Sequence, residues 1–258
     1  ICILMAWAAT FSASAQQKYT VSIKNNLKSA LNDVPATLDL RELKDVKSAT
    51  VIVDGKEIPY QIDDLDGNGT NDELCFLVDL EGKQTKTATI TLSNKADGKQ
   101  WKARTYAEMV LRNPKVKEKN KHDIYLSSIT IDKRTTNPYN VLHHHGVAFE
   151  SELIAMRIYM DKRQTIDLYG KFHKGLELEQ TQFYTSKEQK AQGYGDDVLW
   201  VGNTFGLGAF RGWNGTEPTL LEDVEHRTQR ILTTGPLRTI VEVEDNQWTI
   251  TPGAEPVN

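Results

Sequence analysis

The stretch "ATVIVDGKEIPYQID", residues 49–63, decides the fold class of this chain. Apolar and polar side chains alternate in it with a period of two, and turn residues divide it. A period of two is typical of β-strands, because successive side chains point to opposite faces of a sheet. We therefore predict β-strands here, with Val51 and Val53 facing a hydrophobic core.

The same alternation continues on both sides of this stretch. The further runs are "YTVSIKNN" (19–26), "DELCFLVDL" (72–80) and "KTATITLSN" (86–94). In the run at 72–80, Cys75 and Leu77 occupy the positions that we expect to face the core. The spacing of the runs predicts a small antiparallel sandwich over residues 16–100.

Residues 101–258 also read mainly as strands. The runs are "IYLSSITID" (124–132), "ELIAMRIYM" (152–160), "QTIDLYGK" (164–171), "GLELEQTQFY" (175–184), "DVLWVGNTFGLGAF" (197–210) and "LRTIVEVED" (237–245). One short run, "TSKEQKAQ" (185–192), is helical in character, with Ser186 as its N-cap. We predict an all-β, mainly antiparallel protein whose second domain is a large sandwich or closed barrel that continues beyond residue 258.

Residues 1–15 have the features of an incomplete secretory signal peptide. An apolar run from Ile1 to Phe11 precedes Ala13-Ser14-Ala15, a small-x-small cleavage site. The run is well short of the roughly 20 residues that a membrane-spanning helix needs. We therefore expect a periplasmic or secreted protein that begins at Gln16 and has no membrane span.

The composition narrows the class of partner. Asp and Glu number 35 against 31 Lys and Arg, and no basic stripe is present, so we expect no nucleic-acid partner. Cys75 is the only cysteine left after removal of the leader. Stability must then come from a hydrophobic core and not from disulfide bonds.

An acidic loop, "DDLDGNGTNDEL" (63–74), lies between two predicted strands. Its residues match positions one, three, five, six and nine of a calcium loop, where alternate oxygens converge on the cation and glycine permits a sharp turn. These residues are Asp64, Asp66, Asn68, Gly69 and Asp72. Cys75 occupies the twelfth position in place of a bidentate Glu, so the loop is not a complete EF-hand. The alternatives are a structural calcium site and a hairpin turn rich in turn-forming residues.

Three consecutive histidines, His143, His144 and His145, form the most reactive cluster in the chain. If the stretch is a strand, His143 and His145 share one face and His144 points to the other. Such a pair can bind zinc with a third ligand, for which Glu150, Glu152 and His173 are candidates. The same pair can serve metal-free proton transfer. The predicted catalytic residues are His143, His145, Glu152, Arg157 and Tyr169.

The run "GNTFGLGAFRGW" (202–213) is rich in glycine. Its spacing does not match a dinucleotide-binding loop and no helix follows it, so we expect no organic cofactor. A strand whose glycines allow another backbone or a ligand to approach closely is the better interpretation. We predict that Trp200, Arg211 and Trp213 form a substrate-binding surface, in which flat rings face a sugar and the cation meets a carboxylate.

Three segments resemble a secreted family of Bacteroidetes polysaccharide-utilisation systems that is catalogued as a domain of unknown function. They are "LHHHG" (142–146), "ESELIAMRIYMDKRQTIDLYGK" (150–171) and "EQKAQGYGDDVLWVGNTFGLGAFRGW" (188–213). A fourth segment, "IPYQIDDLDGNGTNDELCFLVDL" (58–80), is similar to the leading β domain of some exo-acting rhamnogalacturonan lyases. The resemblance implies a galactose-mutarotase-like sandwich that acts on plant cell-wall glycans, mainly pectic ones. It implies no catalytic residue.

Three functions follow as hypotheses. A lyase would use a histidine or tyrosine to remove the proton beside a uronic-acid carboxylate, while Arg157 or Arg211 stabilises the developing charge. A hydrolase would use Glu150 or Glu152, which lie roughly 7 Å apart on one strand face. The third hypothesis is a non-catalytic glycan-binding protein.

Overall fold

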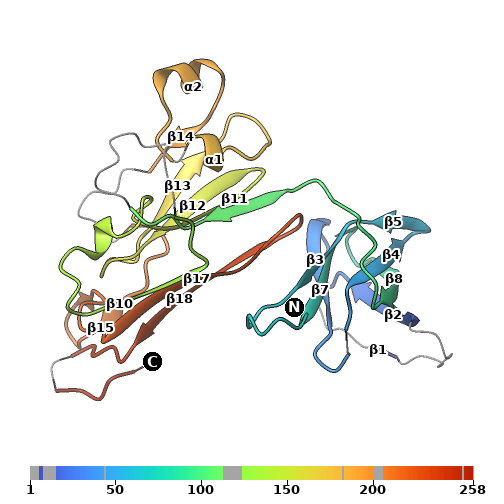
Figure 1. Ribbon diagram of the computed structural model, residues 1–258, viewed down its shortest axis with the longest axis horizontal. Coiled ribbons are helices and arrows are strands. Elements are labelled where there is room, and N and C mark those ends of the chain that lie inside the picture. Colours follow the sequence, from blue (N-terminus) through green and yellow to red (C-terminus); the bar gives the residue numbers. More distant parts are fainter. Residues whose placement is uncertain are drawn as a thin grey trace. The chain divides into compact units, whose positions relative to one another are not determined.

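The computed structural model describes residues 6–7, 16–43, 45–112, 124–181, 183–199, 206–251 and 253–257 (Figure 1). The chain divides into two compact units. Unit 1 comprises residues 1–103 with 235–237, and unit 2 comprises residues 104–234 with 238–258. Each unit is described by itself below.

Unit 1 contains two antiparallel sheets, of strand order β1-β2-β8-β4-β5 and β3-β7-β6. The strands of the first sheet are β1 (Ala6–Trp7), β2 (Gln16–Lys24), β4 (Ser48–Val53), β5 (Lys56–Ile58) and β8 (Thr85–Ser93). The strands of the second are β3 (Leu31–Asp39), β6 (Tyr60–Asp63) and β7 (Glu73–Leu80). The strands predicted between residues 19 and 94 are thereby confirmed.

The core of unit 1 lies between these two sheets. Val51 and Val53 of β4 are buried in it, as predicted. The prediction for β7 was wrong in phase, because Leu74, Phe76 and Val78 enter this core. Cys75 is buried but lies outside the core cluster, and Leu77 is only half-buried. Both faces of β7 are apolar, so alternation alone does not tell which face meets the second sheet.

Unit 2 is built on a five-stranded antiparallel sheet of order β14-β13-β12-β11-β9. Its strands are β9 (Thr105–Glu108), β11 (Gly146–Ser151), β12 (Ile154–Tyr159), β13 (Ile166–Gly170) and β14 (Asp196–Asp197). A three-stranded sheet adds β10 (Ser128–Asp132), β17 (His226–Thr234) and β18 (Thr239–Asn246), and a small hairpin adds β15 (Gly212–Trp213) and β16 (Pro218–Thr219). The helical segments are η1 (Pro138–Asn140), α1 (Leu178–Thr181) and α2 (Lys187–Ala191).

The two faces of the five-stranded sheet have different partners. On one face, Val147 and Ile158 pack with Ile129, Ile231 and Val241 of the three-stranded sheet. On the other, Ala148, Ala155 and Tyr169 pack under Leu178 of α1 and under Phe183. Figure 1 shows α1 and α2 gathered beside β13 and β14. The predicted all-β, mainly antiparallel class is therefore confirmed.

Helix α2 is confirmed, whereas the strand predicted over 175–184 is wrong. The Ser186 hydroxyl accepts the Gln189 amide at 3.1 Å, and the Gln189 side chain accepts the Ser186 amide at 2.9 Å, which completes a capping box. Helix α1 replaces the predicted strand, because the Glu150 carboxylate accepts the amides of Glu177 and Leu178 and so caps its first turn.

The long strand predicted over 197–210 is also wrong where the structure describes it. Beyond β14, the described part of that stretch makes a single bridge, between Leu207 and Ile166. The close approach at these glycines is that of side chains, whereas another backbone or a ligand was predicted: a Cβ added at Gly206 would lie 2.0 Å from the Thr165 side chain, and one at Gly208 would lie 2.7 Å from the Ile166 side chain. Both glycines have positive φ, which bends the chain away from strand geometry. Among the described residues no helix is long and apolar enough to cross a membrane.

Candidate functional site

A row of charged side chains crosses the face of the five-stranded sheet that α1 covers. The strand register pairs Glu108 with Ala148, Ala148 with Arg157, and Arg157 with Asp167. Paired residues in an antiparallel sheet point to the same face, so β9, β12 and β13 each contribute a charge to one row. All three charged side chains are buried. Buried charges need partners, and the contacts of this row define the candidate site.

Arg157 is the centre of the row. Its Nε and Nη2 donate to Asp167 Oδ2 at 3.0 and 2.6 Å, and the Tyr159 hydroxyl donates to the same oxygen at 2.9 Å. A second carboxylate, Asp197 of β14, lies 3.4 Å from Nη2. Burial, together with the nearby charge of Asp167, raises the pKa of Asp197. The Phe183 ring covers the guanidinium at 4.3 Å. Arg157 is thus fixed in place by two strands and by the segment that follows α1.

The Tyr184 hydroxyl lies between Arg157 and His145. Arg157 Nη1 donates to this oxygen at 2.7 Å, and His145 Nε2 lies 3.1 Å from it. His145 Nδ1 lies 2.9 Å from the carbonyl oxygen of Tyr139, which can only accept a hydrogen bond. The proton of neutral His145 therefore lies on Nδ1, and Nε2 accepts the Tyr184 hydroxyl proton. The Tyr184 phenol thus accepts a hydrogen bond from the Arg157 cation and donates one to the His145 imidazole.

Burial lowers the pKa of His145 from 6.5 to about 4, and the positive charge of Arg157 adds to the effect. Burial also raises the pKa of Tyr184, although Arg157 opposes that change. Both side chains are only half-buried, in contrast to Arg157. At neutral pH the pair is therefore an uncharged imidazole and an uncharged phenol, the protonation states that proton abstraction and proton donation require.

The histidine stretch is a turn, so the strand geometry predicted for it is wrong. Residues 138–140 form η1, Leu142 is anchored in the core, and His145 has a φ of 65°. In a turn, neighbouring side chains do not alternate between faces. His144, expected to face away, is fully buried, with its Nε2 2.5 Å from Glu108 Oε1, while Tyr106 donates to Glu108 Oε2 at 2.8 Å.

The remaining predicted catalytic residues have other contacts. Glu152 forms ion pairs with Arg104 at 2.8 Å and with Lys174 at 3.4 Å, and the Arg104 hydrogen bond lowers its pKa. Tyr169 is fully buried and donates to Glu177 at 2.9 Å. His143 is half-buried, and its backbone amide donates to Val110. Of the five predicted residues, His145 and Arg157 are the ones that the structure brings together through Tyr184.

Two predicted substrate-binding residues lie on the β15 side of unit 2. Trp213 is 62% exposed, and Phe210 nearby in the sequence is 65% exposed. Arg211 Nη1 donates to the carbonyl oxygens of Arg163 and Phe210, which fixes the position of this cation. Burial lowers the pKa of Arg211. Trp200 lies outside the described residues.

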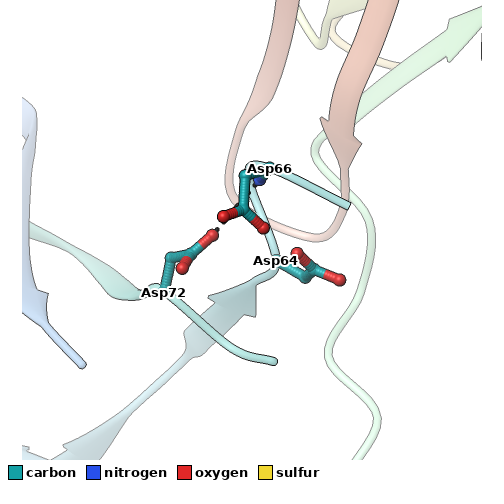
Figure 2. Close-up of side chains that lie close together, drawn as sticks. All are labelled: Asp64, Asp66 and Asp72. Atoms are coloured by element: carbon teal, nitrogen blue, oxygen red, sulfur yellow. Dashed lines mark hydrogen bonds between the residues drawn. The ribbon is translucent and has the colours of Figure 1, made fainter. Parts of the chain in front are cut away.

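The acidic loop of unit 1 brings three predicted calcium ligands together. Carboxylate oxygens of Asp64, Asp66 and Asp72 all lie within 4.8 Å of one another (Figure 2). Asp72 Oδ2 accepts the amides of Leu65 and Asp66, and the second of these bonds is the dashed line in Figure 2. The predicted ligand Asn68 lies in the same turn, where its side-chain amide donates to Asp66. Three clustered carboxylates fit the oxygen ligands that calcium prefers.

Sequence reasoning missed several members of the site. Tyr184, Asp167, Asp197 and Glu108 were not singled out. The sequence did carry a signal for Asp167, because this charge stands between apolar residues of the predicted strand "QTIDLYGK". A charge on a strand must be either exposed to solvent or paired. Tyr184 carries no such signal, since its role depends on a contact with Arg157, 27 residues away.

The architecture defines an all-β protein whose two units have their own cores, with a buried polar row on the principal sheet of unit 2. The model of one family, described as a domain of unknown function (DUF4861), matches residues 23–258, and the chain belongs to this family. No curated protein and no solved structure matches the chain. The predicted membership of a family of unknown function is confirmed, whereas the Bacteroidetes origin, the polysaccharide-utilisation context and the likeness to lyases stay predictions.

Proposed function

We propose that this protein is a periplasmic or secreted carbohydrate-active enzyme that cleaves uronic-acid-containing plant cell-wall glycans by β-elimination. The observation that supports it is the Tyr184 hydroxyl between His145 Nε2, at 3.1 Å, and Arg157 Nη1, at 2.7 Å. Elimination needs a proton acceptor, a proton donor and a cation that stabilises the charge formed. These three groups occur here in one chain of hydrogen bonds.

The proposed step transfers two protons. The Tyr184 hydroxyl turns from His145 Nε2 to the glycosidic oxygen, which frees the Nε2 lone pair. His145 Nε2 removes the proton from the carbon beside the uronate carboxylate, and the electron pair left behind forms the ring double bond. The glycosidic oxygen departs with the bond electrons and takes the Tyr184 hydroxyl proton. Arg157 stabilises the Tyr184 phenolate that results. The proton on His145 Nε2 then passes to the phenolate once the hydrogen bond between them forms again, which restores both residues.

The hydrolase alternative has weaker support. Hydrolysis needs two available carboxyl groups on either side of the scissile bond. Glu150 is buried, forms an ion pair with Lys171 and caps α1, so both of its oxygens have partners. Glu152 is paired with two cations. Both carboxylates are therefore engaged in ion pairs, and this pair does not supply the two available carboxyl groups that hydrolysis needs.

A non-catalytic function in glycan binding has one observation in its favour. The exposed rings of Phe210 and Trp213 are of the kind that packs on sugar faces, and Arg211, which lies between them in the sequence, is held by two backbone carbonyl oxygens. One enzyme can contain both this surface and the elimination centre, by which we mean His145, Tyr184 and Arg157. The two functions differ in whether the protein forms a product.

The test is incubation of the protein with oligogalacturonides and rhamnogalacturonan fragments. Elimination raises the ultraviolet absorbance, because each cut leaves an unsaturated uronate. Tyr184→Phe removes the donated proton and should lower turnover by roughly 100-fold or more. Tyr125→Phe, at a 57% exposed position of the same unit, is the matched control and should retain activity. New reducing ends without absorbance would indicate hydrolysis, and neither signal would leave glycan binding as the function.

A further inference from the structure

A pocket of about 430 Å³ lies in unit 2, and none of the predicted catalytic residues lines it. Its walls come from the end of β10 and the segment after it, from the turn after β12 and from residues ahead of and within β17. The lining residues are Ile131, Asp132, Lys133, Thr135, Thr136, Asn137, Pro138, Tyr139, Asp161, Lys162, Glu222, Val224 and Arg227. The volume lies within the range of about 300–1,000 Å³ that is typical of small-molecule sites.

The buried charges of this pocket have partners in the protein. Asp161 accepts the Arg163 backbone amide at 2.9 Å and the Arg163 Nε at 2.8 Å. Arg227 Nε donates to Asp245 at 2.8 Å, and its Nη2 donates to the Leu221 carbonyl oxygen. A charged ligand would have to break one of these buried pairs, which is costly because it leaves the other partner uncompensated.

The more exposed charges are balanced as well. Lys133 pairs with Glu225, Lys162 pairs with Glu222, and Asp132 pairs with Arg134. The lining contains three acidic and three basic residues, so it has no net charge to attract an anion. Inorganic phosphate and isolated carboxylates are therefore poor ligands for it.

The uncharged groups of the wall suit a ligand with many hydroxyls. Thr135, Thr136 and Asn137 are consecutive in the lining and offer two hydroxyls and one amide, each able to donate and to accept. Neighbouring carboxylate oxygens add acceptors. A sugar ring carries donors and acceptors around its whole edge, so it can satisfy such a wall without a charge of its own.

The pocket reaches the elimination centre through Tyr139. Tyr139 lines the pocket, and its ring stacks on the His145 ring, with the centroids 3.7 Å apart and the planes 7° from parallel. The Arg163 guanidinium lies 4.8 Å from the centroid of the same ring, so Tyr139 is held between the pocket's Asp161–Arg163 pair and the imidazole. One side chain thus separates the pocket from His145.

We infer that this pocket is a subsite for a neutral sugar residue, the one next to the uronate that the His145–Tyr184 centre cleaves. The position beside the cleaved uronate rests on the proposed function, whereas the neutral-sugar specificity rests on the pocket alone. The substrate class is accordingly a glycan in which a uronic acid is joined to a neutral sugar, and a homopolymer of uronic acid is a poorer substrate.

The experiment measures binding of methyl glycosides to the full chain by ligand-observed NMR and calorimetry. The probes are the methyl glycosides of rhamnose, galactose and arabinose, methyl galacturonide and inorganic phosphate. Thr136→Trp fills the pocket from an exposed position. Thr87→Trp, at an exposed position on β8 of unit 1, is the matched control. At least one neutral glycoside should bind, roughly tenfold more weakly to the Thr136→Trp variant and unchanged in the control.

Three results would overturn the inference: no binding of any neutral glycoside, equal binding by the Thr136→Trp variant, or preferential binding of galacturonide or phosphate that this substitution removes. The neutral glycosides contain no carboxylate and cannot undergo elimination, so this test is independent of turnover. If binding occurs but no unsaturated product forms from any glycan, the subsite stands and the elimination function fails. If elimination occurs with the same KM in wild type and Thr136→Trp, the function stands and the subsite fails.

Discussion

Asp167→Ala tests the buried row most directly, because Asp167 accepts four hydrogen bonds: two from Arg157, one from Tyr159 and one from the Leu168 amide. The side chains of Arg157 and Asp167 are 3% and 2% exposed. Removing one partner of a buried ion pair costs about 3–5 kcal/mol, since the other charge is left uncompensated. Here Asp197, 3.4 Å from Arg157 Nη2, remains as a second carboxylate. We therefore expect the free energy of unfolding to fall by an amount at the lower end of this range, about 3 kcal/mol.

The measurement is the free energy of unfolding, obtained from a urea titration that is monitored by a spectroscopic signal from unit 2. Asp132→Ala is the matched control, because it removes an aspartate that is paired with a largely exposed arginine, and its stability should stay close to that of wild type. The double variant Arg157→Met with Asp167→Ala should lose clearly less than the sum of the two single losses, since the buried pair is then removed as a whole and only the half-buried Asp197 loses a cation. An Asp167→Ala protein as stable as the Asp132→Ala protein would refute the role of the row in folding.

Two further predictions concern pH and calcium. His145, with its pKa lowered to about 4 by burial, should titrate by NMR far below the ordinary 6.5. Because the unfolded chain binds this proton more readily, the free energy of unfolding should fall as the pH decreases from about 6.5 to about 4. The fall should be shallower in His145→Gln, and equal slopes in the two proteins would contradict it. Calcium should raise the melting temperature of wild type relative to chelator, since a ligand of the folded state stabilises it. The increase should vanish in Asp66→Ala and persist in Asp54→Ala, and a wild type indifferent to calcium would favour the plain hairpin turn.

The fold class was predictable because alternation is a local property. The run at 49–63 becomes β4, β5 and β6, and Val51 and Val53 enter the core as expected. The phase of β7 was not predictable, since Phe76 and Leu77 are both apolar and only the packing of two sheets decides between them. Helix α1 was also beyond reach, because its four residues are capped by Glu150, a residue of another element.

The candidate site was predictable in part for the same physical reason. Arg157 is a charge within an apolar strand, and such a charge must be paired wherever the strand is buried. His145 was found by its chemistry, but the strand assumed around it was wrong. The positive φ of His145 depends on the preceding η1 turn and on the anchoring of Leu142. These are features of the tertiary structure, and the period of the sequence pattern does not predict them.

The turn geometry also explains why His145 and not its neighbours faces the half-buried edge of the site. A hydrogen bond to Glu108 holds His144 in the interior. His145 instead stacks on the ring of Tyr139 and contacts the hydroxyl of Tyr184. A strand would have given His143 and His145 equal environments, and mutation of either would then have equal effect. In the observed turn the two environments differ, because His145 contacts both the pocket wall and the Arg157 row. If the elimination function holds, substitution of His145 should therefore lower turnover far more than substitution of His143, and equal losses would show that His145 is not the proton acceptor.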